Sequence, residues 1–223
     1  MKYRYVFFDM DGTVLNTLDD LRDSVNHILS ENGLMPISLE ETARNLGNGA
    51  ANLIRQAMII SSGNEPSDEI FHKALDAYKP YYREHSSIKT APYPGILKTM
   101  SALKENGVRM AIVSNKPDNT VQLLSDRYFG NLVETSIGES AEIKKKPAAD
   151  TVFAAMNRMG IPLSKREQCV YIGDTEVDIE TAANSGMDCI AVTWGFRSRE
   201  QLLSAGATVI ADSSEELLNM ILE

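Results

Sequence analysis

Two aspartates near the start of the chain have a spacing that suits chemistry at one point. Asp9 and Asp11 follow the apolar run YVFF and are separated only by Met10. Because residues two apart in an extended segment point the same way, both carboxylates can face one reaction centre, and Gly12 lets the chain turn tightly after them. An Asp-Gly hairpin turn is the other interpretation, although a helical pattern follows. This stretch alone leaves a turn and a site about equally supported.

Two further segments place polar side chains where an apolar run ends or where the next helix begins. Ser114 and Asn115 close the run RMAIV and offer a hydroxyl and an amide, but they would also suit a strand exit that caps the next helix. Lys146 ends a run of three lysines, which is usually a solvated face. Pro147 suits the first turn of a helix and holds the preceding residue extended, so Lys146 could reach over a strand end.

The segment YIGDTEVDIE brings two more carboxylates together. Asp174 ends a buried strand, and Asp178 follows one helical turn later. An acidic cluster that complements a helix dipole is one explanation. A Mg²⁺ site is the other, because this hard cation binds few carboxylates together with waters and phosphate oxygens.

The elements that must position these residues alternate between strand and helix. From residue 93 onward, this alternation predicts an α/β fold with a parallel sheet, whose carboxyl ends form one edge. Complementary groups gathered at that edge favour an active site over four unrelated turns. The predicted strands are 108–116, 132–138, 169–174, 188–194 and 207–211, and the predicted helices are 93–107, 118–129, 148–160, 177–186, 198–206 and 213–222.

Residues 17–87 break this alternation, because they show helical periodicity and hardly any strand-like run. We expect a core domain of residues 1–16 and 88–223 and a helical cap domain of residues 17–87. One cap helix should begin after Ser38, a second should span 47–60, and a third should span 67–85, where Pro80 could interrupt it. Inserted after the first strand, the cap would sit above the edge where ligands bind.

Composition disfavours several classes of function. The 223 residues are 43% hydrophobic and 24% charged, as in ordinary globular proteins. A net charge of −9 repels nucleic-acid backbones and acidic membrane surfaces, so neither is an expected partner. The first apolar run ends at Asp9, too early for a signal peptide or a spanning helix. We expect a cytoplasmic monomer or homodimer.

Over nearly its whole length, the chain resembles the haloacid dehalogenase superfamily. The resemblance depends on four motifs in the order of that family: DMDGT, VSNK, Lys146-Pro147 and GDTEVD. The resemblance implies a Rossmann-like core with an inserted helical cap of the C1 type. Within the superfamily, the chain is most similar to bacterial phosphoglycolate phosphatases. This similarity lies in the stretches DMDGTVLNT, GNGAANLIRQA, SNKP and WGFRSREQLLSAGA. Ala148-Ala149 departs from those relatives, in which a second proline is common, and this changes only loop stiffness.

Carried over motif by motif, the resemblance implies a covalent phosphatase mechanism. Asp9 would be the nucleophile that forms an aspartyl-phosphate, and Asp11 would protonate the leaving group and then activate water. Ser114 and Lys146 would hold phosphoryl oxygens. The implied Mg²⁺ site consists of Asp9, the main-chain carbonyl of Asp11 and Asp174, with Asp178 acting through the water shell of the metal.

Substrate choice is expected to depend on the cap. Gly47 and Gly49 precede a helix whose N-terminal amides could meet an anionic substrate, although a flexible helix start explains them equally well. Arg55 is expected to be a solvated arginine. Trp194, Arg197 and Arg199 either line the site or belong to an exposed loop. The expected substrate-binding residues are Gly12, Thr13, Asn115, Gly47, Asn48 and Gly49.

The expected activity is Mg²⁺-dependent hydrolysis of a small phosphorylated metabolite, with 2-phosphoglycolate as the best single candidate. Pyrophosphate or a nucleotide remain alternatives. A β-phosphoglucomutase-like transfer ranks lower, because the segment NLGNGAANL has no basic residue before Arg55. A silent phosphate-binding module is disfavoured because Asp9 and Asp11 are both present. The acid at position 11 also argues against dehalogenation, since a halide leaving group needs no proton.

Overall fold

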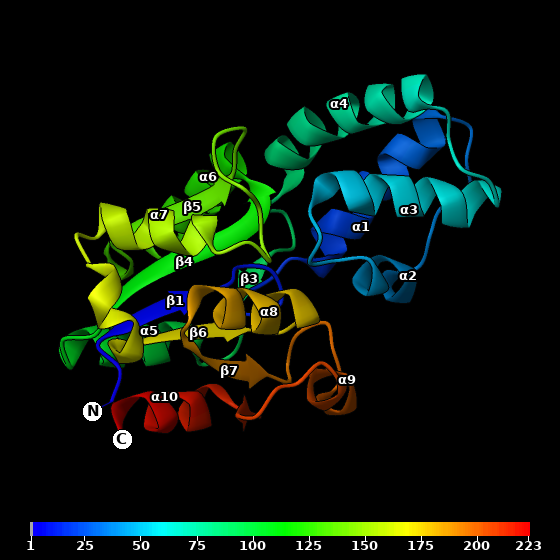
Figure 1. Cartoon of the computed structure of the whole chain (residues 1–223). Helices are drawn as coiled ribbons and strands as arrows, with labels where there is room; N and C mark the ends of the chain where they lie inside the picture. The colour runs from blue at the N-terminus through cyan, green and yellow to red at the C-terminus, as the bar shows by residue number, and fades with distance from the viewer. Residues whose placement is uncertain (1) are drawn as a thin grey trace.

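The apolar runs of the sequence form one six-stranded parallel sheet in the computed structural model, which describes residues 2–223 (Figure 1). The strand order is β5-β4-β1-β6-β7-β8, so the chain moves outward from β1 in both directions. Ligands of open α/β sheets bind at such a switch point, outside the carboxyl ends of the strands. The strands are β1 (Tyr5–Phe8), β4 (Arg109–Pro117), β5 (Thr135–Glu139), β6 (Cys169–Gly173), β7 (Asp188–Val192) and β8 (Ile210–Ala211).

Helices cover both faces of this sheet, because alternate residues of each strand point to opposite sides. Val6 and Phe8 belong to a hydrophobic cluster with α5, α6 and α10, whereas Phe7 belongs to a cluster with α7 and α8 on the other face. The predicted Rossmann-like α/β core is therefore confirmed. The core helices are α5 (Ile96–Glu105), α6 (Asp118–Tyr128), α7 (Asp150–Arg158), α8 (Glu176–Ser185), α9 (Arg199–Ser204) and α10 (Ser214–Leu222), with 3₁₀ turns η1 (Gly130–Leu132) and η2 (Leu163–Gln168).

The register of the central strands sets the level of the polar residues that follow them. Phe8 pairs with Ile112 of β4 on one side and with Ile172 of β6 on the other. Asp9 therefore comes one residue beyond Phe8, at the level where β6 ends and β4 continues to Pro117, and its N–H still donates to the Ile172 carbonyl at 2.8 Å.

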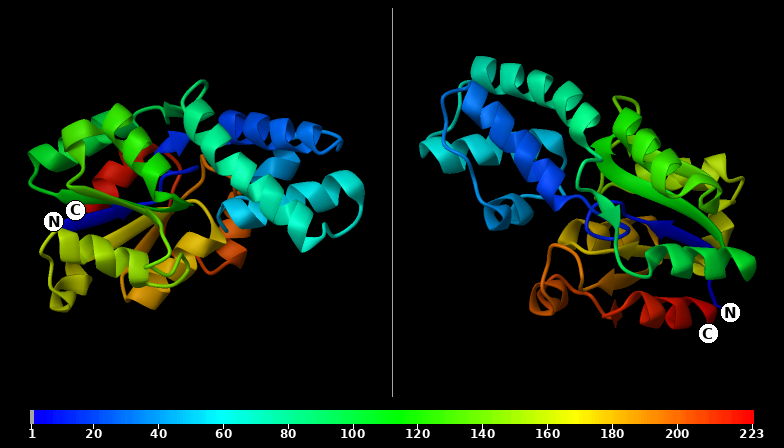
Figure 2. Two further views of the ribbon diagram at one scale, coloured as in Figure 1. Left: turned by 90° about the horizontal axis from the view of Figure 1, so that it is seen from above. Right: turned by 180° about the vertical axis from the view of Figure 1, so that it is seen from behind.

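Four helices between β2 (Leu15–Asn16) and β3 (Ala91–Pro92) pack around a hydrophobic cluster of their own, and we call them the cap helices. β2 and β3 pair antiparallel, so the two connections between these helices and the sheet run side by side. The cap helices lie at one end of the sheet and the chain termini at the other (Figure 2). They are α1 (Leu18–Glu31), α2 (Leu39–Arg44), α3 (Ala50–Ser62) and α4 (Asp68–His85).

Two local expectations about proline are wrong. Helix α4 passes through Pro80 without a break. Proline has no N–H, so the carbonyl of Asp76 loses its helical partner, but Pro80 and Asp76 are both exposed and water can take that place. Pro147 does not lie in the first turn of α7, which begins at Asp150. The chain instead makes a turn in which the N–H of Ala148 donates to the carbonyl of Lys145 at 3.1 Å.

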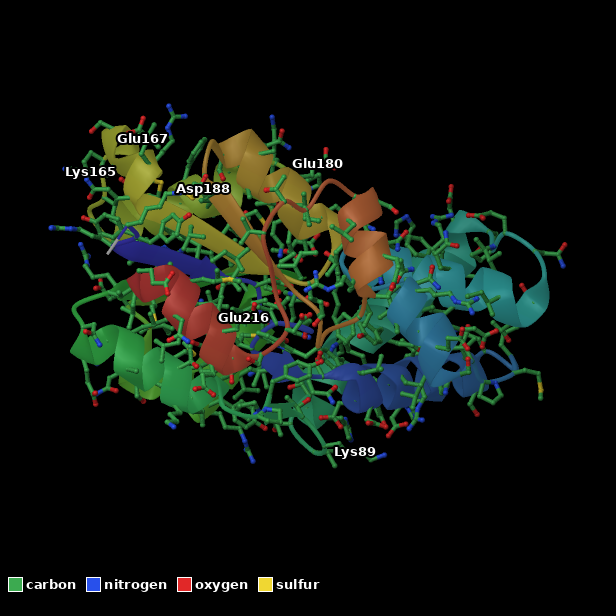
Figure 3. All side chains as sticks on the ribbon, turned by 90° about the horizontal axis from the view of Figure 1, so that it is seen from below. Lys89, Lys165, Glu167, Glu180, Asp188 and Glu216 are labelled. Atoms are coloured by element: carbon green, nitrogen blue, oxygen red, sulfur yellow. The ribbon has the colours of Figure 1, made fainter. Side chains whose placement is uncertain are left out.

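Most charged side chains outside the sheet edge point away from the molecule. Lys165 and Glu167 of η2 and Glu180 of α8 are exposed examples (Figure 3). Against this pattern, the carboxylates and lysines gathered above β1, β4 and β6 are buried.

Candidate active site

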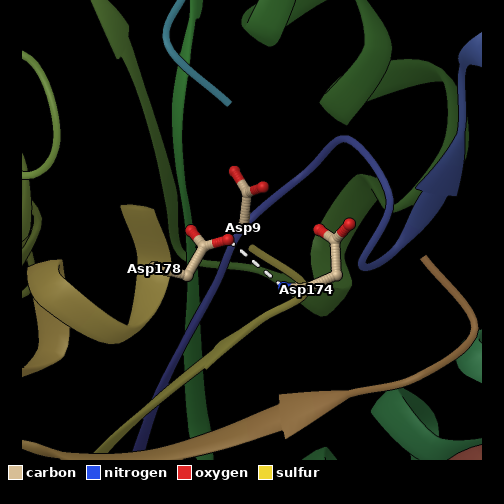
Figure 4. A group of neighbouring side chains, drawn as sticks. All are labelled: Asp9, Asp174 and Asp178. Atoms are coloured by element: carbon tan, nitrogen blue, oxygen red, sulfur yellow. Dashed lines mark hydrogen bonds between the residues drawn. The ribbon is translucent and has the colours of Figure 1, made fainter. Parts of the chain in front are cut away.

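Three buried carboxylates meet at the carboxyl ends of β1 and β6. Asp9 directly follows β1, Asp174 directly follows β6, and Asp178 lies in the first turn of α8. One oxygen from each lies within 4.8 Å of the others, and the three carboxylates surround one small space (Figure 4). The structure therefore brings together residues separated by about three quarters of the chain.

Lys146 is the ammonium group that faces these carboxylates. Its Nζ donates to Asp9 Oδ1 at 2.7 Å, to Asp178 Oδ1 at 2.8 Å and to the Tyr171 hydroxyl at 3.0 Å. An ammonium has three N–H donors, so all of them are used. The Asn115 side chain holds the Lys146 backbone from both sides, accepting from its N–H at 2.8 Å and donating to its carbonyl at 2.9 Å.

Asp178 is held by the start of α8. Its Oδ2 accepts from the N–H of Asp174 at 3.2 Å and from the N–H and hydroxyl of Thr175 at 3.1 and 2.8 Å. Thr175 is the N-cap of α8 and forms a capping box with Asp178. The carboxylate thus orients the start of α8, as the helix-dipole explanation expects, and it also lies in the group of three carboxylates.

Asp174 is enclosed by residues that leave it little freedom. Its Oδ1 accepts from the Thr13 hydroxyl at 3.0 Å, and its Oδ2 accepts from the N–H of Phe196 at 2.7 Å. A Cβ added to Gly12 or Gly195 would lie 2.2 or 2.3 Å from Asp174 Oδ2. Glycine at these two positions is therefore required for the backbone to approach the carboxylate. Gly12 and Thr13 support Asp174, and neither lines the cavity described below.

The charges of the cluster are unbalanced. Burial, together with the neighbouring Asp178 and Asp11 carboxylates, raises the pKa of Asp9 to about 7 despite the opposing effect of Lys146. Burial and the repulsion of Asp178 and Asp9 raise the pKa of Asp174 well above its usual range. Burial lowers the pKa of Lys146, but the attraction of Asp178 and Asp9 outweighs it and the pKa is raised. One ammonium does not neutralise three carboxylates.

This donor set fits a hard divalent cation. Mg²⁺ prefers carboxylate and carbonyl oxygens and keeps several waters, and Asp9 and Asp174 offer oxygens that a bound cation would neutralise. A cation would also remove the repulsion that raises the pKa values of these two groups.

Asp11 lies on the cap side of Asp9 and has two partners that the sequence does not predict. Its Oδ1 accepts from the Thr17 hydroxyl at 2.6 Å and lies 3.1 Å from Lys116 Nζ. Lys116 is buried and also donates to the Tyr82 hydroxyl of α4 at 2.5 Å. The only sequence signal for Lys116 is its position directly after Ser114 and Asn115.

A cavity with about 520 Å³ of empty space, its mouth included, lies between the sheet edge and the cap helices. Gly47 and Gly49 line it, as expected, whereas Asn48 and Arg55 do not. Arg55 instead pairs with Glu65 and lies over the Phe71 ring on the cap. The lining is completed by the catalytic candidates and an apolar wall: Asp9, Asp11, Leu21, Leu46, Ala50, Leu53, Tyr78, Tyr82, Ser114, Asn115, Lys116, Pro117 and Lys146.

The segment after β7 joins the core to the cap. Trp194 Nε1 donates to the Thr13 carbonyl at 3.0 Å, and Arg197 is buried between Glu176 and the end of α2. Arg199 is exposed and pairs with Asp212 at 2.7 Å. Of the three residues that the sequence left undecided, Trp194 and Arg197 therefore support the site from outside the cavity, and Arg199 belongs to the surface.

Within residues 2–223, no helix is both long enough and apolar enough to cross a membrane.

Comparison with known proteins shows which family the chain matches. The family described as "Haloacid dehalogenase-like hydrolase" matches residues 6–192. A phosphoglycolate phosphatase of Pseudomonas syringae pv. tomato is 30% identical over 217 residues, which cover 96% of this chain and 78% of that protein. Phosphoglycolate phosphatase 1 of Pseudomonas aeruginosa has the same identity and coverage.

A solved structure shows the same arrangement of core and cap. It is a candidate phosphoglycolate phosphatase from Lactobacillus delbrueckii subsp. bulgaricus, with a TM-score of 0.90, 38% identity and 99% of each chain covered. Because the family match and these relatives span most of the chain, the resemblance inferred from the motifs is confirmed. The chain belongs to the haloacid dehalogenase-like hydrolases and is a phosphatase of that family.

Proposed function

We propose that this phosphatase hydrolyses a small organic phosphate monoester, best represented by 2-phosphoglycolate, with Mg²⁺ and through an aspartyl-phosphate on Asp9. The observation that carries the proposal is the state of the Asp9 carboxylate. Lys146 holds Oδ1, while Oδ2 has no hydrogen-bond partner among the described residues and belongs to a residue that lines the cavity. One oxygen is fixed and the other is available for attack.

In the first step, Asp9 Oδ2 attacks phosphorus and the bond from phosphorus to the leaving oxygen breaks. Asp11 donates its proton to that oxygen, so the leaving group departs as an alcohol. Ser114 lines the cavity and offers its hydroxyl to a phosphoryl oxygen, while the Lys146 ammonium offsets the charge that accumulates beside Asp9.

In the second step, water attacks the phosphorus of the aspartyl-phosphate. Asp11, now ionised, accepts a proton from this water, the bond between phosphorus and Asp9 Oδ2 breaks, and inorganic phosphate is released. Asp9 is restored as a carboxylate and Asp11 as an acid, which completes the cycle. Asn115 acts on both steps indirectly, because it fixes the backbone of Lys146.

Asp9, Asp174 and the main-chain carbonyl of Asp11 would hold Mg²⁺, and Asp178 would orient its surroundings. When bound, the cation supplies positive charge that stabilises the phosphoryl oxygens during transfer. The unbalanced charge of the three carboxylates supports this assignment.

Relatives named phosphoglycolate phosphatase support the choice of substrate. The test is phosphate release with Mg²⁺, and with EDTA in its place, from 2-phosphoglycolate, β-glucose 1-phosphate, pyrophosphate, nucleotides and p-nitrophenyl phosphate.

The expected result is metal-dependent phosphate release with a preference for 2-phosphoglycolate. Asp9→Asn should release no phosphate, and a cooperative thermal unfolding transition should show that this variant is folded. Preference for pyrophosphate or a nucleotide would overturn the substrate, and no release from any ester would overturn the phosphatase chemistry. Near-normal turnover by Asp9→Asn would exclude Asp9 as the nucleophile.

A further inference from the structure

Two buried lysines line the cavity, and they differ in how completely their ammonium groups are bound. Lys146 uses all three N–H donors on Asp9, Asp178 and Tyr171. Lys116 Nζ has two partners among residues 2–223, the Tyr82 hydroxyl and Asp11 Oδ1. Its side chain is only 3% exposed, so bulk water does not readily supply the third acceptor. A buried ammonium with an unused donor at a cavity wall favours a ligand there.

The position of Lys116 places this unused donor at the leaving-group end of the site. Asp11, which protonates the leaving oxygen in the proposed mechanism, contacts Lys116 directly at 3.1 Å. The Tyr82 ring also lies against the ammonium, 4.2 Å from Nζ to the centroid, and prevents it from swinging toward α4. A group bound to Lys116 would therefore lie close to the oxygen that Asp11 protonates.

Asp11 carries a proton in the proposed first step, so the charge of Lys116 is uncompensated at this end of the cavity and favours an anion. Among the charged residues that line the cavity, Asp9 and Lys146 belong to the phosphoryl end, which leaves Asp11 and Lys116 on the cap side. Helix α3 begins beside them at Ala50, with Gly49 as its N-cap, no side-chain cap and no acid in its first turn. The positive end of this helix adds to the field of Lys116.

We propose that Lys116 is a specificity-determining residue that binds a carboxylate on the leaving group, so that the enzyme selects short phosphorylated hydroxy acids over neutral esters of the same length. The inference rests on the phosphatase function proposed above and names the chemistry of its substrate. Tyr82 is the positioning residue, because its hydroxyl and ring fix the ammonium.

The test compares 2-phosphoglycolate with 2-hydroxyethyl phosphate, in which a neutral alcohol replaces the carboxylate. The ratio of their kcat/KM values is measured for the wild type, Lys116→Met and Lys116→Arg, with Lys144→Met as the control for loss of an exposed lysine. A ratio cancels any effect of Lys116 on Asp11, since Asp11 acts on both esters.

The wild type and Lys144→Met should prefer 2-phosphoglycolate, and Lys116→Met should lower that preference by about 10- to 100-fold, chiefly through KM. Lys116→Arg retains the charge and should restore part of the preference. It also provides a folded comparison if the methionine variant is unstable.

Equal losses on both esters would show that Lys116 serves only Asp11 and would overturn the inference. A wild type that hydrolyses both esters equally would also overturn it, yet would leave the phosphatase chemistry intact. Failure of the proposed function is a separate result, namely no phosphate release from either ester by the wild type.

Discussion

Arg197 is the residue whose replacement should most directly loosen the contact between the core and the cap. It follows β7, is 8% exposed, and forms two hydrogen bonds with the Glu176 carboxylate at 2.8 and 2.9 Å. The same guanidinium donates to the carbonyls of Ala43 at 2.9 Å, Leu46 at 3.2 Å and Arg44 at 3.4 Å. These carbonyls lie at the end of α2 and just beyond it, where a cation is favourable.

The expected magnitude follows from these contacts. When the cap opens, water replaces the guanidinium at the carbonyls. The two shorter contacts, with Ala43 and Leu46, therefore contribute only about 1 kcal/mol each to closure. Their loss in Arg197→Met should therefore cost about 2 kcal/mol, which corresponds to about 30-fold in the equilibrium between the closed and open cap. If the free enzyme is mainly open and closure precedes chemistry, kcat/KM should fall by the same factor.

The assay is kcat/KM for the preferred ester, because this quantity does not include product release. Arg199→Met is the matched control, since Arg199 is two residues away, exposed and paired only with Asp212. Glu176→Gln should act in the same direction as Arg197→Met but more weakly, because it leaves the guanidinium in place. Small-angle scattering with Mg²⁺ and an unreactive phosphate mimic should show a more extended protein for Arg197→Met than for the wild type. An unchanged kcat/KM with an unchanged scattering profile would refute the assignment of Arg197 to closure.

Two further predictions concern the carboxylate cluster. The raised pKa of Asp9, about 7 against 3.8 in an unfolded chain, means that the folded state holds this proton more tightly. Without divalent cations, the free energy of unfolding should fall by up to about 4 kcal/mol as pH rises from about 4 to 7. In chemical denaturation, the free energy of unfolding of Asp9→Asn should lack the part of this pH dependence that comes from Asp9. Identical pH profiles for the variant and the wild type would contradict the assignment. Gly12→Ala should raise the Mg²⁺ concentration needed for half-maximal activity by about tenfold or more, because its Cβ would meet Asp174. Gly206→Ala has a similar positive φ but open space around it, so it should leave the Mg²⁺ requirement unchanged.

The parallel sheet was predictable because its physical causes are local. Apolar runs such as CVYIG alternate with helical patterns, and helices end at glycines with positive φ, among them Gly107, Gly160 and Gly186. The position of Asp9 and Asp174 at the sheet edge was predictable for the same reason, since each directly follows a buried strand. A parallel sheet necessarily brings such strand ends to one edge.

The residues that sequence patterns missed depend on contacts between the core and the cap. Tyr82 looks like any apolar position of an amphipathic helix, and only the folded chain places its hydroxyl on Lys116, 34 residues later. Arg197 likewise looks like a loop arginine until α2 is docked against it. Motif spacing therefore predicts the phosphoryl end of the proposed mechanism, where all groups come from one sheet edge. The leaving-group end combines residues from two separately packed clusters, which is why a choice among substrates is better tested at Lys116 than at the motif aspartates.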